Sequence, residues 1–210
     1  HGAIVSGGGA RATRAQLEAV LPRFIGDIAQ IPPMYSALKR DGQKLCDLAR
    51  QGIDVKVEPR PTQVYAIDVL HENEDGSFIL QIRCGRGMYI RTLCNDIGEA
   101  LGTKAHMGVL LRTQTGMFTL DEAHTIEEID AAEDLTPLLV AMDKPLGHLP
   151  RLDVQPKAER FVRNGNKLTR RELIGDIQPG KPTRLYLNGQ FCGIGRFEGE
   201  NLKFDAMLLE

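Results

Sequence analysis

The sequence has no tryptophan, only four tyrosines and no long apolar run. Its longest apolar run, Leu138 to Met142, is far shorter than the ~20 residues that a membrane-spanning helix needs. No basic-then-apolar segment of the kind that directs secretion opens the chain. We therefore expect no membrane contact.

Cysteine and histidine are also few in the sequence. Its four cysteines fit no metal-site spacing, and its five histidines form no pair at ligand spacing. The sequence contains neither a Gly-Lys-Ser/Thr phosphate loop nor the Gly-x-Ser-x-Gly turn of hydrolases. We expect no metal site, and free thiols that are typical of the reducing cytoplasm.

Net charge is −2, so overall charge gives no argument for nucleic-acid binding. Its distribution is uneven. Residues 1–119 carry 14 Lys/Arg against 12 Asp/Glu, residues 120–150 carry one against 8, and residues 151–210 carry 11 against 8. An acidic connector therefore separates two mildly basic parts.

The most informative stretch is residues 84–102, which follows an expected strand at residues 77–84. Apolar residues alternate up to Cys84, as in a strand, and then recur at helical spacing from Ile90 to Leu101. Glycines flank Arg86 in the turn between them. The start of a helix exposes unpaired N–H groups and a partial positive charge, a favourable place for an anionic, flat ligand such as a nucleotide.

Tyr89 and Arg91 lie at this predicted helix start. Two residues apart inside a helix they would point in different directions, so they can share a site only if the helix begins near Met88 or later. The alternative is that Tyr89 is a boundary aromatic and Arg91 a solvated helix residue.

Residues 30–39, Gln-Ile-Pro-Pro-Met-Tyr-Ser-Ala-Leu-Lys, form a second candidate site. Two prolines stiffen the segment, and a short strand is expected over residues 35–39. Its potential RNA contacts are Tyr35, Ser36, Lys39 and Arg40. Such residues can stack on an unpaired base or contact an RNA backbone, but the segment also fits an ordinary proline-rich surface loop.

Three basic residues at three-residue spacing, Lys157, Arg160 and Arg163, lie on one face of a predicted short helix. They suggest phosphate contact, although a solvated charged face explains them equally well. Short strands dominate the rest of residues 151–210, and Asn188-Gly189 predicts a tight hairpin. Much earlier in the chain, apolar and charged residues alternate over residues 53–57, as in a strand.

Together these segments resemble the TruB family of tRNA pseudouridine synthases, which isomerise the T-loop uridine at position 55 of tRNA. The resemblance runs through residues 30–39, Ala49 to Gly52, residues 84–102 and Leu110 to Gly116, in the family's order and spacing. It covers residues 1 to about 147, and residues 151–210 are similar in kind to a PUA-like RNA-binding domain.

The resemblance implies an isomerase without metal or organic cofactor, expected to be a cytoplasmic monomer that binds the tRNA T-arm. Tyr89 would stack on the target base, Arg91 would orient the catalytic aspartate, and Leu110 would form an apolar wall. Arg86 would join the RNA contacts. A thumb-like insertion at residues 26–57 would grip the T-arm.

The expected fold is α+β. Residues 1–147 would form a partial catalytic domain with a mixed, mostly antiparallel sheet and packed helices, followed by the small β domain at 151–210.

One departure from the family concerns the nucleophile, an aspartate in a Gly-x-x-Gly-x-Leu-Asp-Pro-like loop. No aspartate in this sequence has that context. We therefore expect that an N-terminal portion is missing and that this chain alone is inactive. The main alternative is a non-catalytic RNA-binding module, and a small-molecule enzyme that binds phosphate at Gly85–Gly87 is a third.

Overall fold

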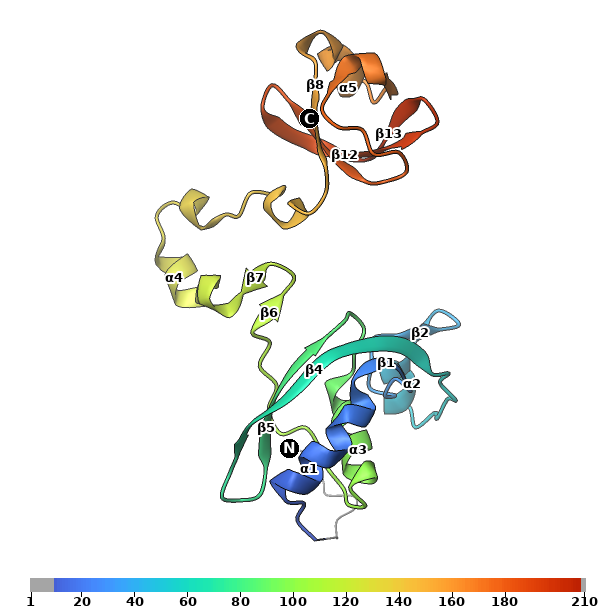
Figure 1. Ribbon diagram of the computed structural model, residues 1–210, viewed down its shortest axis with the longest axis vertical. Coiled ribbons are helices and arrows are strands. Elements are labelled where there is room, and N and C mark those ends of the chain that lie inside the picture. Colours follow the sequence, from blue (N-terminus) through green and yellow to red (C-terminus); the bar gives the residue numbers. More distant parts are fainter. Residues whose placement is uncertain (1–9, 209–210) are drawn as a thin grey trace. The chain divides into compact units, whose positions relative to one another are not determined.

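A computed structural model describes residues 10–208, and the chain divides into two compact units, residues 1–110 (unit 1) and residues 111–210 (unit 2) (Figure 1). The expected catalytic domain at 1–147 and PUA-like domain at 151–210 have a different boundary, and they stay predictions.

Unit 1 combines a three-stranded antiparallel sheet, in the order β1-β4-β5, with helices. Its elements are α1 (Arg14–Val20), a 3-10 helix (Leu21–Phe24), β1 (Gly26–Gln30), β2 (Lys39–Arg40), β3 (Gln43–Lys44), α2 (Leu45–Arg50), β4 (Arg60–Glu72), β5 (Phe78–Cys84) and α3 (Ile90–Ala100). Figure 1 shows α1 and α3 lying against the β4–β5 hairpin. Their apolar faces enclose a core with Leu17, Val64, Leu93 and Ile97.

Local signals define the ends of these elements. The Thr13 side chain accepts a hydrogen bond from the Gln16 amide, and the Gln16 side-chain oxygen accepts one from the Thr13 amide, which completes the capping box of α1. Pro22 lies in the 3-10 helix that follows. Because proline cannot donate a backbone hydrogen bond, it favours the end of α1 at Val20.

The hairpin of β4 and β5 positions the turn that leads into α3. The register between the two strands shifts twice, between Val64 and Ala66 and between Val69 and His71. Each shift marks a β-bulge, in which one extra residue is accommodated on β4. After β5, Gly87 has φ +81° and allows the chain to turn into α3.

Two expected strands are absent from the described residues. Only Lys39 of the segment 35–39 lies in a strand, and residues 53–57 have no strand structure. The residues before Lys39 form bends, and backbone hydrogen bonds join Leu38 to Leu45 and Ser36 to Cys46. Side-chain alternation alone cannot form a strand when no neighbouring strand supplies hydrogen bonds.

Unit 2 contains a six-stranded sheet in the order β10-β8-β11-β12-β13-β9. The strands of this sheet, in chain order, are β8 (Arg151–Val154), β9 (Leu168–Thr169), β10 (Leu173–Ile174), β11 (Thr183–Leu187), β12 (Gln190–Glu198) and β13 (Asn201–Met207). Two further strands of unit 2, β6 (Gln114–Thr115) and β7 (Phe118–Thr119), form a separate two-stranded sheet. Its α-helices are α4 (Ile126–Ala131) and α5 (Glu159–Arg163), and its 3-10 helices are Leu120–Glu122, Thr136–Leu138, Lys144–Leu146, Pro156–Ala158 and Arg170–Glu172. β8 and β11 run parallel, and the other pairs in the sheet are antiparallel.

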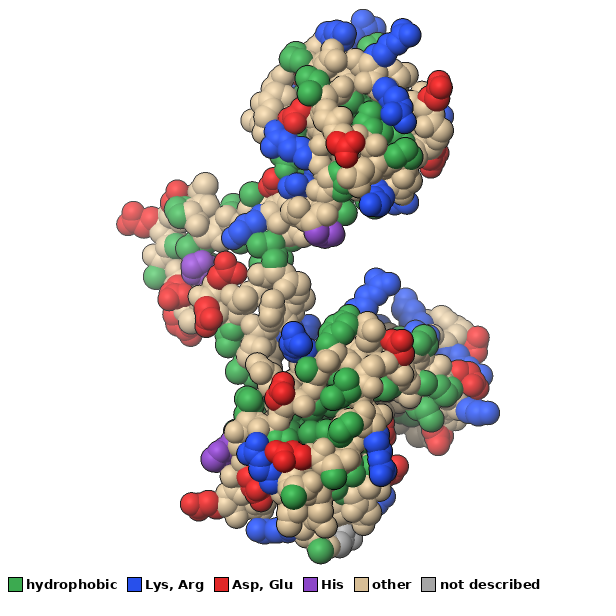
Figure 2. Space-filling model, in the orientation of Figure 1, with side chains coloured by type: hydrophobic (Ala, Val, Ile, Leu, Met, Phe, Trp, Pro, Cys, Tyr) green, Lys and Arg blue, Asp and Glu red, His purple; other side chains and the backbone are tan. Residues whose placement is uncertain are grey.

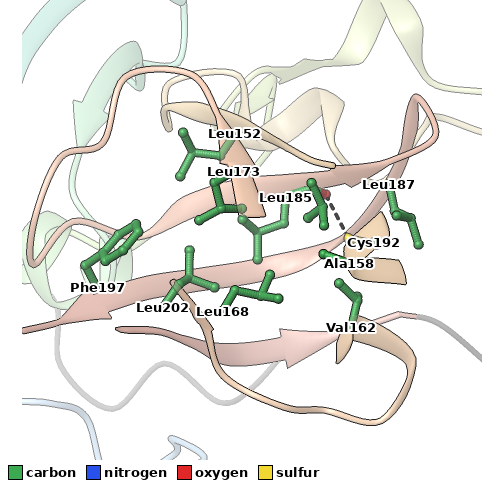
Figure 3. Packing of buried hydrophobic residues seen from close by; sticks show 11 residues of the cluster. Leu152, Ala158, Val162, Leu168, Leu173, Leu185, Leu187, Cys192, Phe197 and Leu202 are labelled. Atoms are coloured by element: carbon green, nitrogen blue, oxygen red, sulfur yellow. Dashed lines mark hydrogen bonds between the residues drawn. The ribbon is translucent and has the colours of Figure 1, made fainter. Parts of the chain in front are cut away.

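The sheet of unit 2 curls around an apolar core (Figure 3). Leu152, Leu185 and Leu202 are fully buried there. The Cys192 thiol donates a hydrogen bond to the Leu185 carbonyl oxygen at 3.3 Å. The expected Asn188-Gly189 turn joins β11 to β12, with positive φ at both residues. The α+β fold with mostly antiparallel sheets is thereby confirmed.

Side chains of the sheet also hold the segment before β8. The Tyr186 hydroxyl donates a hydrogen bond to the Asp143 carboxylate. Arg184 donates to the Leu149 carbonyl oxygen at 3.1 Å. The Arg151 guanidinium lies over the Tyr186 ring, 3.8 Å from its centroid. The packed part of unit 2 therefore includes residues from Asp143 onward.

The four cysteines are thiols rather than disulfides, and Cys192 is the buried one among them. Every helix within residues 10–208 is too short or too polar to cross a lipid bilayer.

Candidate nucleic-acid interface

Helix α3 begins at Ile90, and Tyr89 is its N-cap residue with extended backbone angles (φ −104°, ψ 100°). Tyr89 and Arg91 therefore both lie at the open end of the helix, which is the condition under which they can share a site. No side chain caps this helix end. Its first backbone N–H groups stay available to an anionic ligand.

A buried glutamine fixes the backbone of Tyr89. Gln30, the last residue of β1, is 3% exposed. Its side-chain oxygen accepts a hydrogen bond from the Tyr89 amide at 3.0 Å, and its side-chain nitrogen donates to the Tyr89 carbonyl oxygen at 3.3 Å. This paired contact joins the sheet edge to the helix start across 59 positions of sequence.

Arg91 makes the second link between the two candidate segments. Its guanidinium donates a hydrogen bond to the Tyr35 carbonyl oxygen at 2.7 Å. Arg91 forms no ion pair within the described residues, so the bond to Tyr35 leaves other N–H donors of the guanidinium available. The Tyr35 ring itself is 58% exposed. The structure thus brings Gln30, Tyr35, Tyr89 and Arg91 together.

The remaining residues of segment 30–39 differ in exposure. Lys39 and Arg40 lie on β2 and are exposed. Ser36 is buried (6% exposed), and its hydroxyl has no hydrogen-bond partner among the described residues. Ser36 is therefore covered in this structure, whereas Tyr35, Lys39 and Arg40 are accessible to a large ligand.

Arg86 and Leu110 are both exposed. Arg86 lies in the turn before α3, between Gly85 and Gly87. Leu110 is the last residue of unit 1, and its side chain is 53% exposed. Its expected place as an apolar wall of the site stays a prediction.

Two surface depressions do not involve the helix start. One of about 350 Å³ lies in unit 2 and includes His148, Lys181 and Pro182. The other, of about 320 Å³, lies between α1 and β4. Neither includes Tyr89 or Arg91. That the Tyr89 phenol and the Arg91 guanidinium share one site therefore stays a prediction.

The third candidate group belongs to unit 2. Lys157, Arg160 and Arg163 are exposed on or beside α5. Arg163 pairs with Glu159 at 2.8 Å, so part of its charge is already compensated. Figure 2 shows many Lys and Arg side chains, in blue, on the visible face of this sheet domain.

One carboxylate on α3 has an altered acidity. Burial raises the pKa of Asp96, and the nearby Glu99 adds to the shift. Asp96 lies in the second turn of α3, away from the helix start. Among the residues that the structure describes, no group of three His, Cys, Asp or Glu side chains could hold a metal ion.

Gln30 is the site residue that the sequence did not single out for a role. It stands two positions before Pro32-Pro33. A polar side chain at a buried strand position needs a hydrogen-bond partner, and this was the available signal. Nothing in the local pattern identified the partner as Tyr89.

Comparisons with known proteins agree along the chain. Residues 1–90 match the TruB family pseudouridylate synthase (N terminal domain), and residues 91–146 match the tRNA pseudouridylate synthase B C-terminal domain. The chain is 42% identical over 195 residues to the tRNA pseudouridine synthase B of Alkaliphilus oremlandii (strain OhILAs), which covers 91% of this chain and 64% of that protein.

A second curated relative is the tRNA pseudouridine synthase B of Clostridium perfringens (strain 13 / Type A). It is 36% identical over 200 residues, covering 94% of this chain and 68% of that protein. A third, from Dechloromonas aromatica (strain RCB), is 43% identical over 185 residues, covering 87% of this chain and 60% of its own length. The chain thus spans less than two thirds of the length of the first and third relatives.

Two solved structures share the fold. A Cbf5-Nop10-Gar1 complex matches with a TM-score of 0.68 at 24% identity, covering 94% of this chain and 63% of that one. An H/ACA RNP bound to a substrate RNA containing 2'-deoxyuridine matches with a TM-score of 0.69 at 20% identity. The match covers 96% of this chain and 63% of that one.

Proposed function

Because the chain belongs to the TruB family of tRNA pseudouridine synthases, we propose that it carries RNA-binding and catalytic residues of an enzyme that converts uridine to pseudouridine in tRNA. The reaction breaks the bond between ribose C1′ and uracil N1 and joins C1′ to C5. C5 loses its proton to solvent and N1 takes one up, so the product is an isomer of uridine. The proposed substrate is the T-loop uridine at position 55, approached through the T-arm.

The observation that carries this proposal is the pair of contacts at the start of α3. Gln30 holds the Tyr89 backbone, and Arg91 holds the Tyr35 carbonyl oxygen. They fasten the segment 30–39 and the segment 84–102 into one surface with an exposed aromatic ring, a guanidinium and free helix N–H groups. Unpaired RNA bases are bound by this combination of stacking and charge.

The proposed roles follow from this surface. Tyr89 stacks on the target base and assists proton transfer at C5, while the exposed Tyr35 offers a second ring for an unpaired base. Leu110 packs against the base. Arg86, Lys39 and Arg40 belong to the RNA-binding surface, and the last two lie within a thumb-like insertion at residues 26–57. Ser36, also expected as an RNA contact, is covered in this structure and would have to become exposed to reach RNA.

The nucleophilic carboxylate comes from outside this sequence. No aspartate here stands in a Leu-Asp-Pro context, and the N–H groups of Arg91 that do not bind Tyr35 are donors for such a carboxylate. We propose that Arg91 orients it, and that the 210-residue chain alone binds RNA but does not isomerise uridine.

The second unit is proposed to contribute further RNA contacts. Residues 151–210 form the proposed PUA-like domain, and the family match that ends at residue 146 supports this boundary. The enzyme is proposed to act as a cytoplasmic monomer. It is also proposed to need no metal or organic cofactor, because carboxylate, phenol and guanidinium groups suffice for nucleophilic attack and proton transfer.

Two measurements on the same samples test the proposal. A tRNA T-arm hairpin labelled with tritium at uridine C5 is titrated with the chain for binding and then followed for tritium release. We expect binding without release. Failure to bind the hairpin would contradict the proposed function, and release at the rate of a full-length relative would contradict the inactivity of the chain.

The alternative is a non-catalytic RNA-binding module, which the absence of a matching aspartate favours. The coding sequence upstream distinguishes the two. A Leu-Asp-Pro loop there supports the enzyme, and Tyr89→Phe in a protein that includes it should then slow tritium release far more than it weakens RNA binding. Equal losses would assign Tyr89 to affinity alone.

The role of α5 is tested by salt dependence. Reversing the charges of Arg160 and Arg163 should weaken tRNA binding and reduce the slope of log affinity against log salt by about one per lost phosphate contact. Lys203→Glu is the matched control, since Lys203 is an exposed lysine on β13 that lies 3.8 Å from Glu198. An unchanged slope in the double variant would make α5 an ordinary solvated surface.

A further inference from the structure

Tyr65 is an exposed aromatic residue that none of the roles above includes. It lies on β4 where the register with β5 shifts between Val64 and Ala66, so it is the extra residue of a β-bulge. Its side chain is 55% exposed. A bulge changes the direction of a side chain relative to the regular strand and is common beside functional sites.

The Tyr65 side chain lies against the glycine turn before α3. The Gly85 amide donates a hydrogen bond to the Gln63 carbonyl oxygen at 2.8 Å, which ties the turn to β4. A Cβ atom at Gly85 would lie 3.5 Å from the Tyr65 hydroxyl. The phenol is therefore next to the residue that precedes Arg86.

This end of the sheet is continuous with the candidate interface. Arg60 is paired in register with Gln30, whose side chain holds the Tyr89 backbone. Arg60 and Arg86 are exposed, and neither forms an ion pair with another residue in the range 10–208. Figure 2 shows Lys and Arg side chains projecting around this end of unit 1.

We infer that Tyr65, Arg60 and Arg86 form an additional RNA contact, in which the Tyr65 ring stacks on an unpaired base and the two guanidinium groups contact neighbouring phosphates. Aromatic side chains bind unpaired bases without sequence preference, because every base has a π-face. Arginine supplies the phosphate contacts that fix the strand. This inference rests on the proposed function, since it requires that the chain binds RNA.

The absence of tryptophan from the sequence makes the inference directly measurable. Tyr65→Trp places the only indole of the protein at the bulge, where stacking on a base should quench its fluorescence. The T-arm hairpin serves as the probe, and a fully paired RNA duplex of equal length is its comparison. We expect strong quenching by the hairpin and little by the duplex.

Two further variants separate the possible results. Ile79→Trp is the matched control, since Ile79 is 48% exposed on β5 and pairs with His71 toward the hairpin end of the sheet. It should stay unquenched. Tyr35→Trp reports on the proposed interface and should be quenched.

Each outcome has one meaning. Quenching at Tyr35→Trp with none at Tyr65→Trp would overturn this inference and leave the proposed function standing. Equal quenching at Ile79→Trp and Tyr65→Trp would also overturn it, because the effect would then be unspecific. Absence of RNA binding by every variant would overturn both.

The affinity of Tyr65 variants for the hairpin tests the stacking contact independently of fluorescence. Tyr65→Ala should weaken hairpin binding by about tenfold, whereas Tyr65→Phe, which keeps the ring, should bind within about twofold of the unaltered protein. Thermal unfolding of both variants checks that they fold, as expected for an exposed residue. Equal affinity of Tyr65→Ala and the unaltered chain would contradict the stacking contact.

Discussion

The contact between Gln30 and Tyr89 should contribute measurably to the stability of unit 1. Gln30→Ala removes both hydrogen bonds to the Tyr89 backbone. The Tyr89 carbonyl oxygen keeps the bond that it accepts from the Leu93 amide at 3.0 Å, but its amide loses its partner. An unpaired, partly buried N–H costs about 1–3 kcal/mol and a lost hydrogen bond about 1 kcal/mol.

We therefore expect Gln30→Ala to lower the free energy of unfolding of unit 1 by about 2–3 kcal/mol. Urea unfolding followed by far-ultraviolet circular dichroism measures this difference. The control is Gln81→Ala, an exposed glutamine on β5, which should change the free energy by less than about 0.5 kcal/mol. A loss no larger in Gln30→Ala than in the control would refute the reasoning.

Gln30→Glu adds a pH-dependent version of the same test. A protonated glutamic acid can both accept from the Tyr89 amide and donate to its carbonyl oxygen, whereas the carboxylate can only accept. Burial should raise the folded-state pKa of this carboxyl above its ordinary value of about 4.3. The stabilisation by the protonated side chain of Gln30→Glu is then present below pH ~4.3 and is lost as the pH rises through the folded-state pKa.

Three further predictions concern packing and titration. Gly98→Ala should destabilise unit 1 by about 3 kcal/mol or more despite the better helix propensity of alanine, because the new Cβ would lie 2.5 Å from the Ala105 amide nitrogen. Equilibrium unfolding measures this loss of stability. A stabilised variant would contradict the close packing. Burial raises the pKa of the Cys192 thiol to about 11 from its ordinary 9.0. Unit 2 should therefore lose stability as the pH rises from about 9 to about 11. Cys192→Ala should remove that part of the pH dependence of stability in urea unfolding. An identical pH profile in the variant would refute the role of this thiol. The hydrogen bond from Tyr186 is the largest cause of the lowered pKa of Asp143. The difference in unfolding free energy between the unaltered protein and Tyr186→Phe should therefore be full above pH ~4 and shrink as the pH falls further. A difference that stays constant in acid would contradict this prediction.

The sequence predicted the features that depend on neighbouring residues. Apolar residues at helical spacing from Ile90 to Leu101 predicted α3, which spans Ile90–Ala100. The Asn188-Gly189 turn needs only the tolerance of its two residues for positive φ. Such signals are complete within a few residues, so they are readable without knowledge of the fold.

Features that join distant segments were not readable in this way. Residues 53–57 alternate, but alternation does not say whether a neighbouring strand is available, and none pairs with them among the described residues. The bonds from Gln30 to Tyr89 and from Arg91 to Tyr35 span more than 50 positions. The sequence indicated that both segments matter, and only the fold placed them together.

The location of bound RNA is the most direct test of this account. Amide hydrogen exchange of the 210-residue chain, measured by mass spectrometry with and without the T-arm hairpin, should show new protection in residues 30–44 and 85–91. Protection confined to the basic residues around α5, with no change at the start of α3, would contradict it.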